Sequence, residues 1–303
     1  MTESNRDNFE IVGPPDAPVV AVLGGISASR HVTSTVSDPR AGWWEEFVGP
    51  NKAIDTNRFR VLSIDYLTSG RKDRPLTTHD QALRLATALD LACVAQVRAI
   101  VGASYGGMVA LAFGAIAPQR VEHIVVIGAA HESAPIATAV RILQRRIVEL
   151  GLSTGRGYEA LVIARGLATT TYSSAEEFGN RFERGCDDEP REICRQIGVA
   201  LEKSGERFAD ACTPEGFLAL SQSLDLHAVR PEDIRVPVTL IAVEEDALVP
   251  VAQARELAAR LSGRCQLVEL RSPSGHDTFL HAPTLIAPFV TRSLEAQVVF
   301  AHD

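Results

Sequence analysis

The chain has 303 residues, of which 46% are hydrophobic and 22% charged. This composition fits one large globular domain or two coupled ones and excludes a disordered chain. The net charge is −8 and no basic run stands out, so we expect neither nucleic acid nor a membrane surface as a partner. No apolar stretch approaches the roughly 20 residues of a membrane span, and the polar N-terminus predicts no signal peptide. We therefore expect a cytoplasmic protein.

Six short apolar runs predict strands that are buried on both faces of a parallel sheet. They cover residues 18–23, 59–64, 98–102, 124–127, 236–243 and 265–270. Helical periodicity lies between and after them, at residues 80–95, 108–115, 251–261 and 285–294. Alternating strands and helices indicate an α/β fold, in which ligands collect at the carboxyl ends of the strands.

The segment from about residue 131 to residue 230 interrupts this alternation. It contains helical stretches only, at residues 136–150, 158–169, 175–182, 190–203 and 214–224. An insertion of this length between two strands far exceeds the usual connection of about 4–6 residues. We interpret residues 132–230 as a helical cap domain over the strand ends, and residues 1–131 with 231–303 as the core domain. The alternative is a helical domain with no part in function.

The strongest local motif is Gly102-Ala103-Ser104-Tyr105-Gly106, which follows a predicted strand and precedes a predicted helix. This G-x-S-x-G pattern is typical of a nucleophile elbow, a tight turn that exposes a serine hydroxyl above the sheet. Side chains two residues to either side of the serine would collide with the backbone, so glycine is needed there. We predict Ser104 as the nucleophile.

A serine nucleophile needs a histidine base and an acid that orients the histidine, in the chain order Ser, Asp/Glu, His. His276 lies in a loop after the last predicted strand, where the base belongs. Asp246 follows the strand at 236–243 and is our predicted acid, with Glu244 and Glu245 as competitors.

The oxyanion that forms during attack needs two backbone N–H donors. Tyr105, directly after the nucleophile, supplies one. The turn Leu23-Gly24-Gly25-Ile26 follows the first core strand and can supply the other, and we name Leu23 as its donor. The alternative for these two glycines is a tight turn with no catalytic part.

No metal or disulfide site is indicated. The cysteines are odd in number and form no C-x-x-C pair, which disfavours a disulfide scaffold and a thiolate zinc site. They are Cys93, Cys186, Cys194, Cys212 and Cys265. H-E-x-x-H is absent and no acid–histidine cluster has metal spacing.

Several stretches together resemble the homoserine O-acyltransferases, a branch of the α/β-hydrolase fold. The segment Gly42-Trp43-Trp44-Glu45-Glu46-Phe47 is similar to the tryptophan-pair segment of that family, and Ser104-Tyr105-Gly106-Gly107-Met108 to its S-M-G-G-M. Gly275-His276-Asp277-Thr278-Phe279-Leu280 resembles its G-H-D-A-F-L. In the predicted cap, Ala164-Arg165 and Tyr172-Ser173-Ser174 resemble its A-R and Y-R-S landmarks. The family's G-S-T-G-P loop is replaced by Thr68-Ser69-Gly70-Arg71-Lys72.

The resemblance implies an α/β-hydrolase fold, a mostly parallel central sheet with an inserted helical cap. It also implies a ping-pong acyl transfer, in methionine biosynthesis, from acyl-CoA to the hydroxyl of L-homoserine, with acetyl preferred over succinyl as the acyl group. CoA enters as a co-substrate, so no prosthetic cofactor is expected. By the same resemblance, Asp277 holds the α-ammonium of homoserine and Arg165 its α-carboxylate; the alternatives are a helix cap for Asp277 and a solvated residue for Arg165. A homodimer joined through the cap is likewise expected.

Three other interpretations remain open at this point. The acceptor could be serine, the same triad could hydrolyse carboxylic esters, or the fold could serve as a non-catalytic binding module. Arg141, Arg145 and Arg146 add a basic stretch in the predicted cap. One of them could bind the free carboxylate of a succinyl donor, contact CoA phosphates, or simply be solvated.

Overall fold

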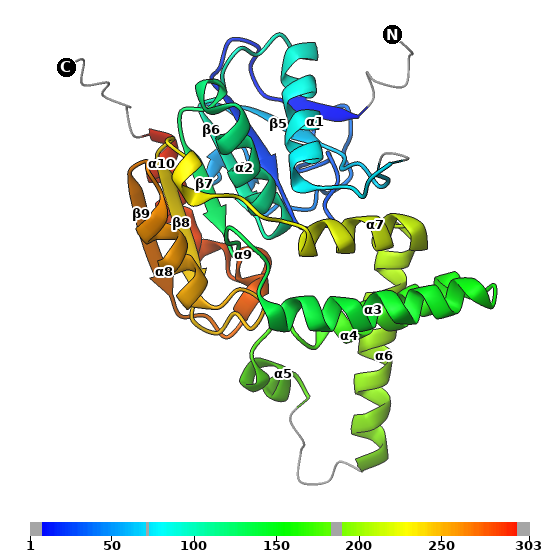
Figure 1. The fold of residues 1–303 in the computed structure, drawn as a ribbon. Helices are drawn as coiled ribbons and strands as arrows, with labels where there is room; N and C mark the ends of the chain where they lie inside the picture. Colours follow the sequence, from blue (N-terminus) through cyan, green and yellow to red (C-terminus); the bar gives the residue numbers. More distant parts are fainter. Residues whose placement is uncertain (1–7, 71–72, 183–189, 296–303) are drawn as a thin grey trace.

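The computed structural model describes residues 8–70, 73–182 and 190–295, and its centre is one twisted sheet (Figure 1). The seven strands run in the order β1-β5-β2-β6-β7-β8-β9. Their bounds are β1 (Phe9–Val12), β2 (Val19–Leu23), β5 (Arg60–Ile64), β6 (Ala99–Ala103), β7 (Ile124–Ile127), β8 (Val238–Val243) and β9 (Cys265–Leu270). Only β1 pairs antiparallel, so the predicted α/β-hydrolase fold with a mostly parallel sheet is confirmed.

All six predicted strands are present, whereas β1, β3 and β4 went unpredicted. Strand β1 lies at the sheet edge beside β5 and is only half-buried, and its four residues, one of them Glu10, form too short an apolar run to stand out in the sequence. The two-residue strands β3 (Val48–Gly49) and β4 (Ile54–Asp55) form a separate small ladder. Elements this short are fixed by tertiary contacts rather than by local pattern.

Two hydrophobic clusters cover the two faces of the sheet. Along β2, Ala21 and Leu23 belong to one cluster and Val20 and Val22 to the other, as the two-residue period of a strand requires. Helices α1 (Thr78–Leu91), α2 (Tyr105–Ile116) and α8 (Val251–Arg260) contribute to the first. Helix α10 (Pro283–Glu295) contributes to the second, together with the segment around Trp44. The short helix α9 (Thr278–His281) precedes α10.

Five helices separate β7 from β8 and form a layer beyond one end of the sheet (Figure 1). They are α3 (Pro135–Ser153), α4 (Gly157–Thr169), α5 (Ala175–Arg181), α6 (Pro190–Ala209) and α7 (Pro214–Asp225). Proline at the first position suits the starts of α3 and α7, where no N–H partner is needed. The layer has its own apolar cluster, which includes Val148, Leu161, Phe208 and Phe217. The predicted helical insertion is thus present, with its helices within three residues of their expected ranges except α6, which ends six residues later than expected.

The structure also bears on the predictions about disulfides and membrane spans. Four cysteines are described and each is unpaired, while Cys186 lies outside the described residues. Within the described ranges, no helix is both long and apolar enough to cross a bilayer.

Candidate active site

The G-x-S-x-G segment forms a strained turn between β6 and α2. Ser104 lies in the left-handed region, at φ 53° and ψ −119°, a conformation that costs a non-glycine residue about 1–3 kcal/mol. A Cβ on Gly102 would lie 2.3 Å from the carbonyl oxygen of Gly106, and one on Gly106 would lie 2.2 Å from that of Leu23. Both glycines are therefore required by contacts with backbone. The turn leaves the Ser104 side chain at the carboxyl end of β6.

An unbroken hydrogen-bond chain joins the three predicted catalytic side chains. The Oγ of Ser104 is 2.8 Å from Nε2 of His276, and Nδ1 of His276 is 2.7 Å from Oδ2 of Asp246. The other oxygen of Asp246 accepts the backbone N–H groups of Leu248 and Val249, at 2.8 and 2.9 Å. These two hydrogen bonds fix the Asp246 carboxylate so that its Oδ2 contacts the imidazole of His276. The side chains come from three different loops that meet only in the folded chain.

The competing carboxylates are engaged elsewhere. Glu244 pairs with Arg271 at 2.7 Å. Glu245 accepts the backbone N–H of Ser272 at 2.8 Å. Neither contacts the histidine within the hydrogen bonds of the described residues, so the geometry selects Asp246 from the three.

The buried pair of Asp246 and His276 controls the proton on the imidazole. Burial by itself lowers the pKa of His276, but the charge and hydrogen bond of Asp246 outweigh it, so the pKa is raised above its ordinary value of 6.5. A base with a raised pKa accepts the serine proton more readily. It also has to be neutral before attack, which ties activity to pH.

Of the two predicted oxyanion donors, Tyr105 is placed to donate its N–H to an oxyanion, whereas Leu23 lies away from the cavities at Ser104. Tyr105 is the first residue of α2, where an N–H has no partner within the helix. Leu23 is buried inside β2, its carbonyl oxygen faces Gly106, and it lines neither of the cavities at Ser104. In the turn that follows, Ile26 lines both cavities. The N–H groups of Tyr105 and Ile26 donate to no acceptor in the hydrogen bonds of the described part of the chain.

The turn after β2 is held against the nucleophile elbow by Gly24. Its carbonyl oxygen accepts the N–H of Gly106 at 2.9 Å and the hydroxyl of Tyr66 at 2.8 Å. A Cβ at Gly24 would lie 2.7 Å from the Trp43 ring, so a side chain has no room there. These contacts place Ile26 beside Ser104.

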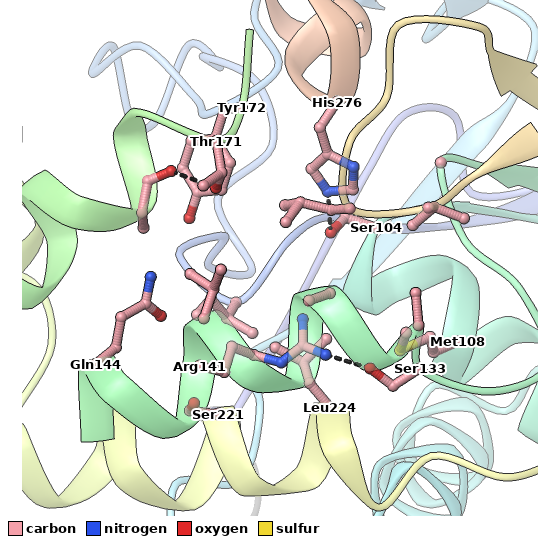
Figure 2. A pocket seen from close by; sticks show the side chains of 18 of the residues that line it. Ser104, Met108, Ser133, Arg141, Gln144, Thr171, Tyr172, Ser221, Leu224 and His276 are labelled. Atoms are coloured by element: carbon pink, nitrogen blue, oxygen red, sulfur yellow. Dashed lines mark hydrogen bonds between the residues drawn. The ribbon is translucent and has the colours of Figure 1, made fainter. Parts of the chain in front are cut away.

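Ser104 and His276 lie where two cavities meet. The cap-side cavity, with about 760 Å³ of empty space, is also lined by Met108, Arg141, Gln144, Ser221 and Leu224 (Figure 2). The turn-side cavity, with about 570 Å³, is also lined by Gly25, Ser27, Trp43, Asp277 and Leu280. Ile26, Arg165 and Tyr172 line both. A reacting group on Ser104 can therefore contact two separate sets of side chains.

Arg165 is held rigidly at this junction. Its Nη1 donates to the hydroxyl of Tyr172 at 2.7 Å, and its guanidinium carbon is 4.8 Å from the ring centroids of Tyr172 and Phe208. Its Nε is buried and donates to no acceptor among the described residues. A buried N–H without an acceptor is costly, so a ligand oxygen would be favoured here.

Asp277 lines the turn-side cavity and is about one-fifth exposed. Its side chain makes no capping hydrogen bond to the helix that follows, although capping was the alternative to a binding role. Nε2 of the His281 ring lies 3.8 Å from Oδ2. The carboxylate therefore remains available to a cationic group in the cavity.

The tryptophan pair closes one wall of the turn-side cavity. Trp43 and Trp44 stack with their ring centroids 5.1 Å apart. Trp44 is buried and donates to the carbonyl oxygen of Phe279 at 2.8 Å, whereas Trp43 lines the cavity. The pair thus ties this wall to the loop that carries His276 and Asp277.

Comparison with known proteins places this arrangement in a family. A protein-family model described as the alpha/beta hydrolase family matches residues 34–289. The chain is 38% identical over 294 residues to the homoserine O-succinyltransferase of Xanthomonas campestris pv. campestris, which covers 95% of this chain and 79% of that protein. The chain belongs to the homoserine O-acyltransferase family of α/β hydrolases. It is therefore an acyltransferase by descent, as the sequence resemblance implied.

Other similar proteins carry names with a different acceptor or a different reaction. The serine O-succinyltransferase of Litchfieldella anticariensis is 33% identical over 317 residues, covering 89% of this chain and 86% of that protein. Among solved structures, homoserine O-acetyltransferase from Bacillus anthracis aligns with TM-score 0.85 at 20% identity, covering 96% and 92% of the two chains. Esterase E22 aligns with TM-score 0.82 at 20% identity, covering 95% and 93%. At these identities, the solved structures show the shared fold alone.

The three arginines of the basic stretch occupy different places on α3 of this family member. Arg141 lines the cap-side cavity, Arg145 is half-buried behind it, and Arg146 is exposed, 3.9 Å from Glu149. They do not form one face, because positions 145 and 146 lie about 100° apart around a helix.

Sequence reasoning missed two polar residues of the site. Tyr172 was noted only as part of a family landmark, and Gln144 only as a letter within the basic stretch. Both line the cap-side cavity. For Gln144, the signal was its position three residues after Arg141, which places both on one side of a helix. The Tyr172 loop carries no pattern that sequence alone could have read.

Proposed function

We propose that this chain transfers an acyl group from acyl-CoA to the side-chain hydroxyl of L-homoserine by a two-step mechanism through Ser104. The observation that carries the proposal is the complete hydrogen-bond chain Ser104–His276–Asp246 at the junction of two cavities. Membership of the homoserine O-acyltransferase family supports the choice of reaction.

In the first step, Ser104 attacks the thioester carbonyl. Nε2 of His276 takes the hydroxyl proton as the new C–O bond forms. The tetrahedral intermediate then collapses, the C–S bond breaks, and the imidazolium gives its proton to the leaving CoA thiolate. The products of this half-reaction are an ester on Ser104 and free CoA.

The oxyanion of both intermediates is stabilised by the backbone N–H groups of Tyr105 and Ile26. Tyr105 was the expected donor after the nucleophile. Ile26 replaces Leu23 in our proposal, because Ile26 lines the cavities and Leu23 is buried within β2. One such donor is worth about 2.7–4 kcal/mol of transition-state stabilisation in other enzymes.

In the second step, homoserine enters the turn-side cavity and His276 removes its hydroxyl proton. Asp277 pairs with the α-ammonium, and the Arg165 guanidinium binds the α-carboxylate, where its buried Nε lacks an acceptor. The hydroxyl oxygen attacks the ester, and the Ser104 oxygen leaves with the proton from His276. O-acylhomoserine forms and the enzyme returns to its starting state.

The test is thiol release from acetyl-CoA and succinyl-CoA with homoserine, serine or no acceptor, in wild type and Ser104→Ala. We expect release that requires homoserine and is lost in Ser104→Ala. Release that ignores the acceptor, or rapid cleavage of a simple ester with no thiol release, would assign the chain to the ester hydrolases instead. A Ser104→Ala protein that remains active would refute the mechanism.

Serine is the second candidate acceptor. Serine carries the same α-ammonium and α-carboxylate as homoserine, and relatives named serine O-succinyltransferase match over most of the chain. Its hydroxyl is one methylene nearer to these groups. With Arg165 and Asp277 fixed, the distance from them to His276 decides between the two acceptors, and the same assay separates them.

The remaining parts of the proposal concern cofactors, cellular location and oligomeric state. We propose that no prosthetic group takes part, that acyl-CoA is a co-substrate, and that the enzyme works in the cytoplasm in methionine biosynthesis. We also propose a homodimer joined through the helical layer. Its support is a set of exposed apolar side chains on α3 and α4, among them Leu143, Leu150 and Ile163, each at least 60% exposed.

A further inference from the structure

The cap-side cavity contains polar side chains that the proposed reaction does not use. Arg141 and Gln144 lie one turn apart on α3 and line it on the side away from Ser104 and His276 (Figure 2). Gln144 is 4% exposed, and its amide has no partner in the hydrogen bonds of the described residues. A buried amide and a mostly buried guanidinium that face a cavity point to a polar ligand.

The contacts of Arg141 leave one of its terminal nitrogens free. Its Nε donates to Oδ1 of Asp225 at 2.7 Å, and its Nη2 donates to Oγ of Ser133. Its Nη1 has no acceptor among the described residues. Figure 2 shows that one terminal nitrogen of Arg141 contacts Ser133, while the other points toward the space below Ser104.

The charges around Arg141 do not balance. Asp225 is shared by two arginines, since its second oxygen is 2.6 Å from Nη1 of Arg145. The three side chains are only 10–16% exposed, so one positive charge is left over in a mostly buried place. Glu132, at the edge of the cavity, is exposed and makes no ion pair with Arg141 in the described part of the structure. An anion in the cavity would complete this set of charges.

We propose that Arg141, assisted by Gln144, binds the terminal carboxylate of a dicarboxylic acyl group, so that the preferred donor is a succinyl-type thioester. The inference rests on the proposed acyl transfer. The acyl chain runs from the ester on Ser104 into the cap-side cavity, and its carboxylate meets the free Nη1 of Arg141. The arrangement replaces our expectation of an acetyl donor, because an acetyl group has no charge to place there.

The acceptor's own carboxylate is a poor alternative ligand for Arg141. Asp277, which would hold the acceptor's ammonium, lines the turn-side cavity and not the cap-side one. Arg141 lines the cap-side cavity and not the turn-side one. An amino-acid acceptor that contacts Asp277 therefore has its carboxylate at Arg165, which lines both cavities.

The test compares succinyl-CoA with butyryl-CoA, a donor of equal chain length without the charge. In wild type we expect kcat/KM for succinyl-CoA to exceed that for butyryl-CoA by about 30-fold or more, as for a buried carboxylate–arginine pair. In Arg141→Met, kcat/KM for succinyl-CoA falls by a similar factor while that for butyryl-CoA stays within about threefold. Arg145 still pairs with Asp225 in this variant, which protects the fold. Arg141→Lys restores part of the preference.

Two controls separate this role from others. Arg146 lies on the same helix but is exposed, so Arg146→Met should leave kcat/KM for both donors unchanged. Succinyl and butyryl thioesters of N-acetylcysteamine carry no phosphates, and the same dependence on Arg141 is expected with them. If Arg141→Met lowers the rate for CoA thioesters only, Arg141 binds phosphate and the proposal fails.

The proposal is also overturned if Arg141→Met lowers kcat/KM equally for succinyl-CoA and butyryl-CoA. It is overturned as well if the wild-type protein uses butyryl-CoA as well as succinyl-CoA. In those cases, continued homoserine-dependent thiol release from any donor would leave the proposed acyl transfer standing. No transfer from any donor to any acceptor would mean that the proposed function itself had failed.

Discussion

Backbone geometry and side-chain chemistry meet at Ser104. The residue adopts φ 53° because Gly102 and Gly106 let the elbow lie against its own backbone and against Leu23. The same turn places the serine oxygen 2.8 Å from the His276 base. Strain held by the surrounding packing is a frequent feature of catalytic turns. These residues were predictable from sequence because each has a fixed place in a short motif.

Replacement of Asp246 by asparagine tests the pH control of the base. In wild type the pKa of His276 is raised above 6.5, so activity should fall as pH drops through that raised value and the base becomes protonated. In Asp246→Asn the main charge that raises the pKa is gone, although Asp277 still raises it, so the acid limb of the kcat/KM profile moves to lower pH. The rate falls by about 10⁴-fold, as expected when the imidazole loses its orienting acid.

The matched control is Glu244→Gln, two residues away, where the carboxylate pairs with Arg271 instead. In Glu244→Gln, the acid limb of the kcat/KM profile should lie at the same pH as in wild type, and the rate should be the same. An acid limb in Asp246→Asn at the wild-type pH would contradict the assignment of Asp246.

Asp277→Asn tests the acceptor step alone. Without the carboxylate that pairs with the ammonium, discharge of the acyl-enzyme by homoserine should slow by about 30-fold or more. At a pH well above the pKa of His276, which the Asp277 charge also raises, discharge by 4-hydroxybutyrate, which lacks the ammonium, should be unchanged, and so should formation of the acyl-enzyme. Stopped-flow measurement of the two half-reactions checks this. Equal slowing with both acceptors would mean that Asp277 acts on the loop that carries His276 rather than on the substrate.

The positions of the long helices could be predicted from the sequence, but the helices against which each of them packs could not. Periodicity placed α3, α4 and α7 within a few residues of their true ends. The packing partner of each face could not be read from the sequence, because α4 packs against both α3 and α6. Arg141 and Arg146 show the consequence. They are close in sequence, yet one faces a cavity and the other faces solvent.

Two glycines on α6 test this packing. A Cβ at Gly205 would lie 2.4 Å from the carbonyl oxygen of Val162 on α4, whereas a Cβ at Gly198 meets nothing within 4 Å. Gly205→Ala should therefore destabilise the protein by about 2 kcal/mol or more, because α4 and α6 must move apart. Gly198→Ala should stabilise it by about 0.5–1 kcal/mol through helix propensity. Urea denaturation measures both, and a Gly205→Ala protein as stable as wild type would contradict the α4–α6 contact.

For the whole molecule, buried neutral histidines set the response of stability to acid. Burial lowers the pKa of His227 to about 3 and that of His123 to about 4. The His227 ring bridges Thr78 on α1 and the carbonyl oxygen of Ala130 after β7, at 2.8 and 3.1 Å. Both histidines stay neutral in the fold below pH 6.5, where the unfolded chain takes up protons. Their contribution to stability is complete above pH 6.5 and is lost as pH falls towards 4 and 3.

His227 alone should cost about 2 kcal/mol of stability between pH 8 and pH 5. His276 works in the opposite sense, because its pKa is raised, and offsets part of the loss. In His227→Asn, the free energy of unfolding should be lower at pH 8 but should fall less between pH 8 and pH 5. Urea titrations at the two pH values measure this. A drop as large as in wild type would contradict the buried, neutral state of His227.

The order of strands and helices could be predicted from sequence for most of the chain, because buried parallel strands form continuous apolar runs. The hydrogen-bond chain of Ser104, His276 and Asp246 was predictable too, since strand ends collect at one edge of the sheet. The sequence named Leu23 as the second oxyanion donor, whereas in the structure Ile26, three residues later, lines both cavities at Ser104. The turn Leu23–Ile26 carries no pattern that tells which N–H faces Ser104. The division of the site into two cavities depends on how the helical layer sits over the sheet, which no local pattern encodes.

The most direct test of the account is the mass of the protein mixed with acyl-CoA and no acceptor. We predict one added acyl group, located on Ser104, that is lost within seconds after homoserine is added and only slowly in water alone. The account is contradicted if no adduct forms while turnover proceeds, or if water removes the acyl group as fast as homoserine does. The first result would mean direct transfer without a covalent intermediate, and the second a hydrolase.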